Sequence, residues 1–135
     1  MKELEITAVV ENLPKVIDFV EEQTAAFGCS PRVSAQIDVA VEEVFVNIAH
    51  YAYYPETGPA VIRVETVREP LQVILTFLDN GQPFDPLVRS EPDIEQPLTD
   101  RDPGGLGIFM VRQIMDDVSY EYRNGQNILT FTKKV

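Results

Sequence analysis

The spacing of apolar residues along the chain follows two periods, which predicts a mixture of strands and helices. Alternation with a period of two marks a first strand in residues 3–10 and a closing hairpin in residues 119–135. Two further runs, residues 59–69 and 71–80, are rich in β-branched residues and predict a second hairpin. In the closing hairpin, Asn124–Gly125 is typical of a type I′ turn.

Apolar residues three and four apart predict helices between these strands. Asn12 is a candidate N-cap and Gly28 a candidate C-cap, so they bound a first helix. Ser30 and Pro31 have the chemistry of an N-cap followed by a first helical position. We expect the helix that they open to run unbroken to the turn at residues 55–58.

Residues 86–103 interrupt this regular pattern. They are rich in proline and acidic residues and contain few periodic apolar positions. A connection of this length is typical of a functional lid or of a disordered segment. A glycine cluster and a third predicted helix follow it. We therefore interpret residues 86–103 as a lid inserted into one domain that spans residues 1–135.

The order of the elements predicts the fold class. A strand, two helices and two strands precede the lid, and a helix and two strands follow it. Strands covered by helices on one face make an α+β two-layer sandwich.

Composition restricts the partners and the compartment. A length of 135 residues suits a single domain, and a net charge of −11 argues against nucleic acid and anionic membranes as direct partners. The single cysteine, Cys29, excludes an internal disulfide and fits a reducing compartment. No apolar run reaches the roughly 18 residues of a membrane span, and the first residues lack a signal-peptide pattern. We expect a cytoplasmic protein.

The stretch VEEVFVN, residues 41–47, carries two carboxylates and an amide inside a predicted core helix. At about 100° per residue, Glu42 falls opposite the apolar stripe, whereas Glu43 and Asn47 share one flank of it. Because these two are four residues apart, they are neighbours on the helix surface. The carboxylate suits a proton acceptor, and the amide oxygen suits a ligand of Mg²⁺. A solvated helix edge with an incidental amide is the alternative interpretation.

An apolar strand ends abruptly in Asp79, which is followed by Asn80 and Gly81. An Asp at this place makes an Asx-turn, or it projects into a pocket and accepts a hydrogen bond from a ligand's amino group. Gly81 allows a flat ligand to approach the backbone closely. Turn chemistry alone is the alternative explanation for this segment.

Gly104, Gly105 and Gly107 lie immediately before the third predicted helix. Glycine amides at the positive end of a helix are typical of an anion site, and a flexible hinge for the lid is the alternative. The motif is neither a P-loop nor a dinucleotide fingerprint, since no Gly-Lys-Ser/Thr follows and no strand precedes it. Taken together, the three features predict one site for a phosphate-bearing ligand and Mg²⁺.

Three segments resemble, in chain order, the N, G1 and G2 boxes of the GHKL ATPase superfamily. They are EEVFVNIAHYAY, DNGQPFDP and GGLGIFMVRQIMDDVSYEYRNGQNIL. The likeness is greatest to the anti-sigma-factor serine/threonine-protein kinase branch, and it covers the chain from about Ile6 to the end. It implies a Bergerat-type ATP-binding fold, with a mobile lid at about residues 86–103. The sheet of that fold is mixed but mostly antiparallel, with helices on one face.

The resemblance also implies ATP and Mg²⁺ as cofactors and assigns roles to residues. Glu43 would be the catalytic base and Asn47 the ligand of Mg²⁺. Asp79 would accept a hydrogen bond from the adenine amino group, and Gly81 would line the base pocket.

The G2 box adds contacts to the phosphates. The nucleotide-binding residues there would be Gly104, Gly105, Leu106, Gly107 and Ile108. Arg101, late in the lid, is a candidate contact of the γ-phosphate, with a solvated charge as the equal alternative.

In the resembled branch, the kinase phosphorylates a small anti-sigma-factor antagonist protein on Ser or Thr and holds a sigma factor. Homodimers are common in that branch, although the residues do not establish the oligomeric state. A non-catalytic ATP-binding module that sequesters a partner is the alternative function. The ATPase half of a histidine kinase is a third, disfavoured by the lack of a phosphoacceptor-helix domain.

Two positions depart from the family pattern. Pro83 stands where the superfamily has a second glycine, a form that resembles the anti-sigma branch. Many members of that branch have His four residues after the N-box Asn, where this chain has Tyr51. His50 precedes it, and we interpret this histidine as a surface residue, with a contact to Glu43 or the nucleotide as the alternative.

Overall fold

The computed structural model describes residues 1–85 and 105–135, and for residues 105–109 it describes the backbone alone. The lid predicted at residues 86–103 therefore lies outside the described residues. The main elements are, in chain order, β1 (Lys2–Thr7), α1 (Leu13–Phe27), α2 (Pro31–Asn47), β2 (Pro59–Arg68), β3 (Leu71–Asp79), α3 (Gly105–Ile114), β4 (Asp117–Arg123) and β5 (Gln126–Lys134). A 3-10 turn, Val10–Asn12, precedes α1, and a π-helical segment, Ile48–Ala52, extends α2.

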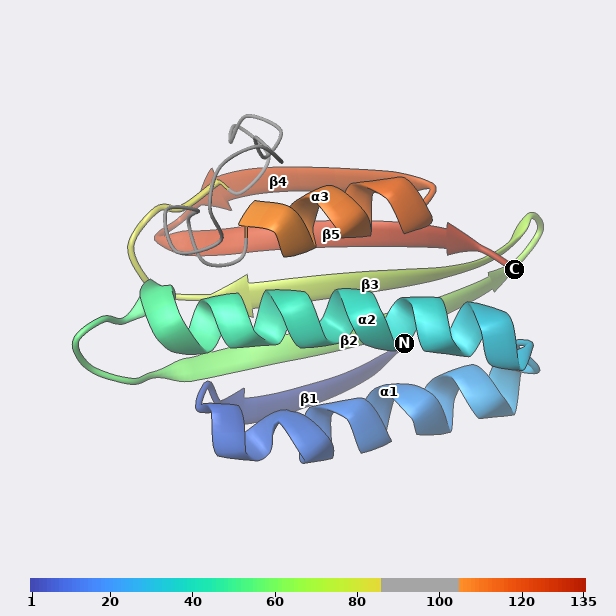
Figure 1. Cartoon of the computed structure of the whole chain (residues 1–135), viewed down its shortest axis with the longest axis horizontal. Helices are drawn as coiled ribbons and strands as arrows, with labels where there is room; N and C mark the ends of the chain where they lie inside the picture. Colours follow the sequence, from blue (N-terminus) through green and yellow to red (C-terminus); the bar gives the residue numbers. More distant parts are fainter. Residues whose placement is uncertain (86–104) are drawn as a thin grey trace.

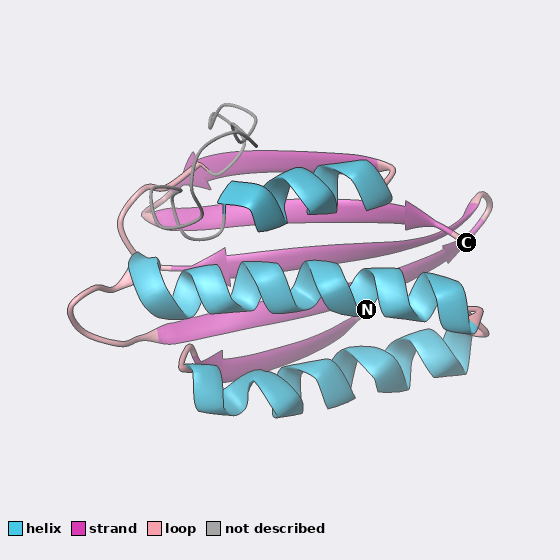
Figure 2. Cartoon of the chain, in the orientation of Figure 1, coloured by secondary structure: helices cyan, strands magenta, loops and turns pink. Residues whose placement is uncertain are grey.

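The strands form one sheet in the order β1-β2-β3-β5-β4, and the helices cover one face of it (Figure 1). In Figure 2, α1 and α2 lie over one half of the sheet and α3 over the other. The predicted α+β two-layer sandwich is confirmed. All four described strand pairings are antiparallel, so the mixed character that the resemblance implied is absent from the described sheet.

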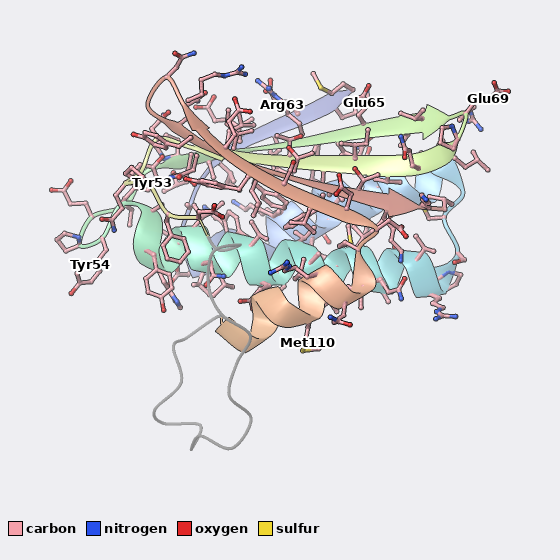
Figure 3. The ribbon with its side chains drawn as sticks, turned by 90° about the horizontal axis from the view of Figure 1, so that it is seen from above. Tyr53, Tyr54, Arg63, Glu65, Glu69 and Met110 are labelled. Atoms are coloured by element: carbon pink, nitrogen blue, oxygen red, sulfur yellow. The ribbon has the colours of Figure 1, made fainter. Side chains whose placement is uncertain are left out.

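No described helix covers the opposite face of the sheet (Figure 1 and Figure 3). Figure 3 shows Arg63 and Glu65 of β2 pointing away from the helices, and Met110 of α3 pointing away from the sheet. Arg63 pairs with Glu3 of β1 at 2.7 Å. Both side chains are exposed, so this ion pair adds little to stability.

The predicted caps and turns are confirmed with one exception. Gly28 ends α1 in the left-handed conformation, at a φ of 88°. The Ser30 hydroxyl accepts a hydrogen bond of 3.2 Å from the amide of Val33. Asn124 and Gly125 both have positive φ, as a type I′ turn requires. Asn12 takes the predicted N-cap position before α1, but its side chain donates to the carbonyl of Thr7 and makes no capping hydrogen bond.

The core lies between the helices and the covered face of the sheet. Its largest fully buried side chains include Ile37 and Phe45 of α2, Phe77 of β3 and Phe131 of β5. The rings of Phe77 and Phe131 meet edge to face, 5.8 Å apart. Burial at Ile37, Val41, Val44 and Ile48 confirms the apolar stripe expected for this helix.

The long second helix does not keep one geometry. Its α-helical part ends at Asn47, and residues Ile48–Ala52 are π-helical. Carbonyls at a helix end lack partners within the helix. Here Gln82, in the loop after β3, donates two hydrogen bonds of 2.9 Å. Its backbone amide donates to the Ala52 carbonyl, and its side-chain amide donates to the Tyr51 carbonyl. The loop after β3 therefore completes the end of this helix.

Gly81 is required by that contact. A Cβ atom at this position would lie 2.2 Å from the carbonyl oxygen of Ala52 and 2.6 Å from its Cβ. Both are far inside the van der Waals distance. The glycine thus lets two backbone segments approach each other, and the close approach of a flat ligand stays a prediction.

A polar seam joins α1 to α2. The hydroxyls of Thr24 and Ser34 are 3.2 Å apart, and Asp38 faces Glu21 one turn further on. The Oδ1 atom of Asp38 is buried and has no partner within the described residues. Burial raises the pKa of Asp38 to about 7, and the hydrogen bond and negative charge of Glu21 add to the shift.

No helix within residues 1–85 and 105–135 is both long and apolar enough to cross a membrane.

Asp38→Asn should flatten the dependence of stability on pH. Because the folded pKa of Asp38 is raised, the unfolded chain loses its proton first, and stability falls as the pH rises from about 4 to about 7. We expect the free energy of unfolding of the variant to exceed that of wild type by on the order of 1 kcal/mol at pH 8 and by little at pH 5, allowing for solvent screening. Urea unfolding at both pH values measures this. The control is Asp18→Asn, on the exposed face of α1; equal pH slopes for wild type and Asp38→Asn would contradict the account.

Gly81→Ala should destabilise the fold by roughly 1–3 kcal/mol, because the new methyl group overlaps the end of the π-helical segment. Gly28→Ala is the control, since its Cβ would meet nothing within 4 Å and only its positive φ opposes the change. We expect it to cost about 1 kcal/mol. Urea unfolding of both variants compares these costs. A smaller loss at Gly81 than at Gly28 would show that the loop tolerates displacement from Ala52.

Candidate functional site

A pocket opens between the end of α2 and the covered face of the sheet. Its empty space is about 470 Å³, counting the part open to solvent. The lining residues are Val44, Asn47, Ile48, Tyr51, Ala52, Phe77, Asp79, Phe84, Tyr120, Asn127 and Leu129. Apolar walls with a few convergent polar groups are typical of a small-molecule site.

The two glutamates of α2 lie in different environments, as helical phase predicted. Glu42 is exposed, whereas Glu43 is half-buried and accepts a hydrogen bond of 3.0 Å from Nδ2 of Asn47. Asn47 also lines the pocket, so its pairing with Glu43 occurs at the pocket's edge. The proximity of the pair is confirmed, and its chemical roles stay predictions.

This hydrogen bond determines how the Asn47 amide is oriented. A carboxylate only accepts hydrogen bonds, so the NH₂ group of Asn47 must point to Glu43 and its Oδ1 must point away. An amide oxygen is a hard ligand of the kind that Mg²⁺ prefers, and Mg²⁺ takes few ligands from protein and keeps phosphates and waters. The residues present therefore fit a magnesium ion held mainly by a phosphate-bearing ligand.

Asp79 ends β3 inside the pocket and is only 6% exposed. Its Oδ1 accepts hydrogen bonds of 2.9 Å from the Gly81 amide and from Nδ2 of Asn127. Its Oδ2 accepts none from the described residues, yet is not fully buried. Oδ1 therefore makes the Asx-turn, and a contact between Oδ2 and a ligand stays a prediction.

The charge of Asp79 depends on opposing effects. Burial raises the pKa of this carboxyl group, and the hydrogen bonds from Asn127 and Gly81 lower it. The carboxylate also raises the pKa of the Tyr53 hydroxyl, after the larger effect of burial. Burial is the larger effect, so the pKa of Asp79 stays above its usual value, and the two donors limit that rise in favour of the charged, acceptor-only form.

Sequence reasoning missed Asn127 and Tyr120, which join the hydrogen bonds around Asp79 in the pocket. Asn127 is paired with Asp79 in the β3–β5 register, and Tyr120 lies on β4 with its hydroxyl bonded to Oδ1 of Asn127. The available signal was the alternation in β5, where Asn127 shares the covered face with Leu129 and Phe131. An amide at a core-facing strand position requires a partner, and that partner was Asp79.

Tyr51 and Phe84 form an aromatic wall of the pocket. Their rings are stacked, with centroids 6.0 Å apart and an angle of 21° between the planes. Tyr51 takes the position where the resembled branch has His. His50 is exposed, with its ring edge-on to Tyr51 at 6.0 Å, so it is the surface residue that the sequence predicted.

The remaining predicted residues lie in different places. Gly81 is beside the pocket, against Ala52, and is not a lining residue. Arg101 and Gly104 lie outside the described residues. The segment 105–108, Gly105, Leu106, Gly107 and Ile108, is the first turn of α3.

The placement of Gly105 and Gly107 before the third helix was therefore wrong. Because the amides of a first turn have no partner within the helix, an anion site at this segment stays a prediction.

Comparison with known proteins gives the family. The model of the histidine kinase-like ATPase domain matches residues 6–133. The serine/threonine-protein kinase BtrW of Bordetella bronchiseptica is 29% identical over 129 residues, which are 96% of this chain and 90% of that protein.

The serine-protein kinase RsbW of Halalkalibacterium halodurans is 32% identical over 101 residues, which are 72% of this chain and 60% of that protein.

A solved structure shows the same fold. The structure of the RsbU and RsbW domains of Rv1364c from Mycobacterium tuberculosis is similar with a TM-score of 0.68 at 16% identity. The similarity covers 99% of this chain and 32% of that one. The matched family segment contains Glu43, Asn47 and Asp79. The chain belongs to the histidine kinase-like ATPase domain family.

Proposed function

We propose that the chain is an ATP-dependent serine/threonine-protein kinase that acts on a small antagonist protein. The observation that carries this proposal is the hydrogen-bonded pair of Glu43 and Asn47 at the edge of a pocket with Asp79 inside it. One pair of side chains supplies a base and a metal ligand, and the buried carboxylate supplies a contact for the nucleotide base.

The pocket suits adenine. Its walls are apolar and aromatic, which matches a flat heterocycle. Oδ2 of Asp79 is an acceptor without a partner within the described residues. The exocyclic amino group of adenine is the donor that it would bind, and a charged acceptor strengthens that hydrogen bond.

The phosphates would extend toward Asn47. In this proposal, Oδ1 of Asn47 holds Mg²⁺, which when bound neutralises charge on the phosphate oxygens. The amides of Gly104 and of the first turn of α3, residues 105–108, would receive phosphate oxygens. Arg101 and the segment 86–103 would cover the γ-phosphate as parts of a lid.

Glu43 would serve as the base for phosphoryl transfer. Its carboxylate takes the proton from the hydroxyl of a Ser or Thr on the partner protein. The hydroxyl oxygen forms a bond to the γ-phosphorus as the bond from that phosphorus to the β-γ bridging oxygen breaks, and ADP leaves with that oxygen. Asn47 donates to Glu43 throughout, which keeps the carboxylate oriented.

The partners in this proposal come from the relatives. BtrW and RsbW are named as serine/threonine- and serine-protein kinases. By the resemblance to the anti-sigma branch, the acceptor is a small antagonist protein, and the unmodified antagonist releases a sigma factor held by the kinase. We extend the proposal to a homodimer and to the cytoplasm, where ATP and a free thiol at Cys29 both fit.

Glu43→Gln should abolish transfer and preserve nucleotide binding. Glutamine still accepts the hydrogen bond from Asn47 but takes no proton, so we expect phosphotransfer to fall roughly 10²- to 10⁴-fold with ATP affinity nearly unchanged. Glu42→Gln is the matched control, because Glu42 is exposed. The assay incubates each protein with Mg²⁺-ATP and candidate antagonist proteins and maps phosphorylated residues.

Three outcomes separate the alternatives. Loss of transfer in Glu43→Gln alone supports the kinase. Equal transfer by wild type and Glu43→Gln removes Glu43 as the base. ATP binding by wild type with no phosphoprotein from any antagonist supports a non-catalytic module that acts by sequestering a partner.

A further inference from the structure

The side-chain amide of Asn127 makes four hydrogen bonds. Its Nδ2 donates to Oδ1 of Asp79 at 2.9 Å and to the Gln82 carbonyl at 2.8 Å. Its Oδ1 accepts from the Phe84 amide at 3.1 Å and from the Tyr120 hydroxyl. An amide has two N–H donors and two lone pairs, so its capacity is fully used.

The orientation of this amide is unambiguous. Asp79 and the Gln82 carbonyl only accept, and the Phe84 amide only donates. Exchanging the nitrogen and the oxygen would place a donor against a donor and acceptors against acceptors. Asn127 is only 6% exposed. Removing its amide would therefore leave the partner groups without hydrogen bonds at a place that bulk water does not reach.

Asn127 therefore determines which face of Asp79 meets the pocket. Oδ1 of Asp79 is held by two donors, Asn127 and the Gly81 amide. A carboxylate fixed through one oxygen presents the other in a single direction. That second oxygen, Oδ2, is the acceptor open to a ligand.

We propose that Asn127 is a positioning residue that makes the pocket select a purine with an amino group at C6 over one with a carbonyl there. This inference rests on the proposed binding of ATP. Held by Asn127, Asp79 offers an acceptor only, which binds the amino group of adenine and repels the carbonyl of guanine. The Asn127 amide has no donor left for that carbonyl, because Asp79 and Gln82 take both.

The same amide also holds the aromatic wall. The Phe84 amide donates to Asn127, and the Phe84 ring stacks on Tyr51. Loss of the amide would thus loosen both the hydrogen-bond acceptor and the stacked ring beside it. The hydrogen bond from Phe84 to Asn127 thus links the group that would bind the edge of the base to the aromatic rings of the pocket wall.

Protonation gives a readout that a purely structural role would not change. The hydrogen bond from Asn127 lowers the pKa of Asp79 against the effect of burial. Among the described residues, Tyr53 and Tyr120 are the titratable side chains that interact with this carboxylate, Asp85 lies next to Tyr120, and Tyr51 lines the same pocket. Removal of Asn127 therefore raises the pKa of Asp79, so its acid form, a donor, appears at higher pH. A donor there suits the carbonyl of guanine.

The test compares wild type with Asn127→Leu, which keeps the approximate shape and removes all four hydrogen bonds. Calorimetric titrations with ATP and with GTP, at pH 6 and pH 8, give the two affinities and their ratio. Thr130→Ala is the matched control, because Thr130 is on the same strand but on the opposite face of the sheet. Circular dichroism and urea unfolding confirm that each variant is folded.

We expect wild type and Thr130→Ala to prefer ATP by roughly 100-fold or more. Asn127→Leu should lose roughly 10- to 100-fold in ATP affinity, and its preference for ATP should fall further at pH 6 than at pH 8. If Asn127→Leu does not fold, Asn127→Thr, which keeps one hydroxyl, should shift the preference in the same direction by a smaller factor.

Two results overturn the inference. The first is an unchanged ATP/GTP ratio and pH profile in the folded Asn127 variant, whether or not both affinities fall together. The second is a wild type that binds ATP and GTP equally. A wild type that binds neither nucleotide instead contradicts the proposed function, and the inference then falls with it.

Discussion

A buried hydrogen bond from Asn127 to Asp79 joins the candidate site to the centre of the sheet. The two residues are paired across β3 and β5, so their positions follow from the backbone register. Burial alone would favour a protonated Asp79, and the donors on its Oδ1 oppose that tendency. The site depends on this balance, because a carboxylate accepts from an amino group and a carboxylic acid donates instead.

The fold and the pocket share a second constraint, the contact between the loop after β3 and the end of α2. Gln82 satisfies two carbonyls of the π-helical segment, and Gly81 makes the approach sterically feasible. Extra residues per turn in a π-helix change which side chains face the sheet. Tyr51 and Ala52 consequently line the pocket, and His50 points to solvent. One loop thus completes a helix, positions Asp79 and forms the mouth of the pocket.

Local periodicity was enough to predict the part of the site that lies on one helix. Glu43 and Asn47 are one turn apart, and regular helical geometry brings them together. Asp79 was recognisable as a charge that ends an apolar strand. Asn127 was not, because its role depends on the register between two strands whose paired residues are 48 positions apart, and Tyr120 was not, because it reaches the site through Asn127. The π-helical segment was missed because a helical wheel assumes one constant angle per residue.

The most direct test of the account is the nucleotide preference of Asp79→Asn. Asn127 and the Gly81 amide both donate to Oδ1, so the new amide must keep its oxygen there and turn its NH₂ group toward the pocket. Calorimetric titration should show ATP affinity reduced at least about 10-fold, with a marked relative gain for GTP. An ATP/GTP preference equal to that of wild type, in a folded variant, would contradict the claim that Asp79 recognises the base.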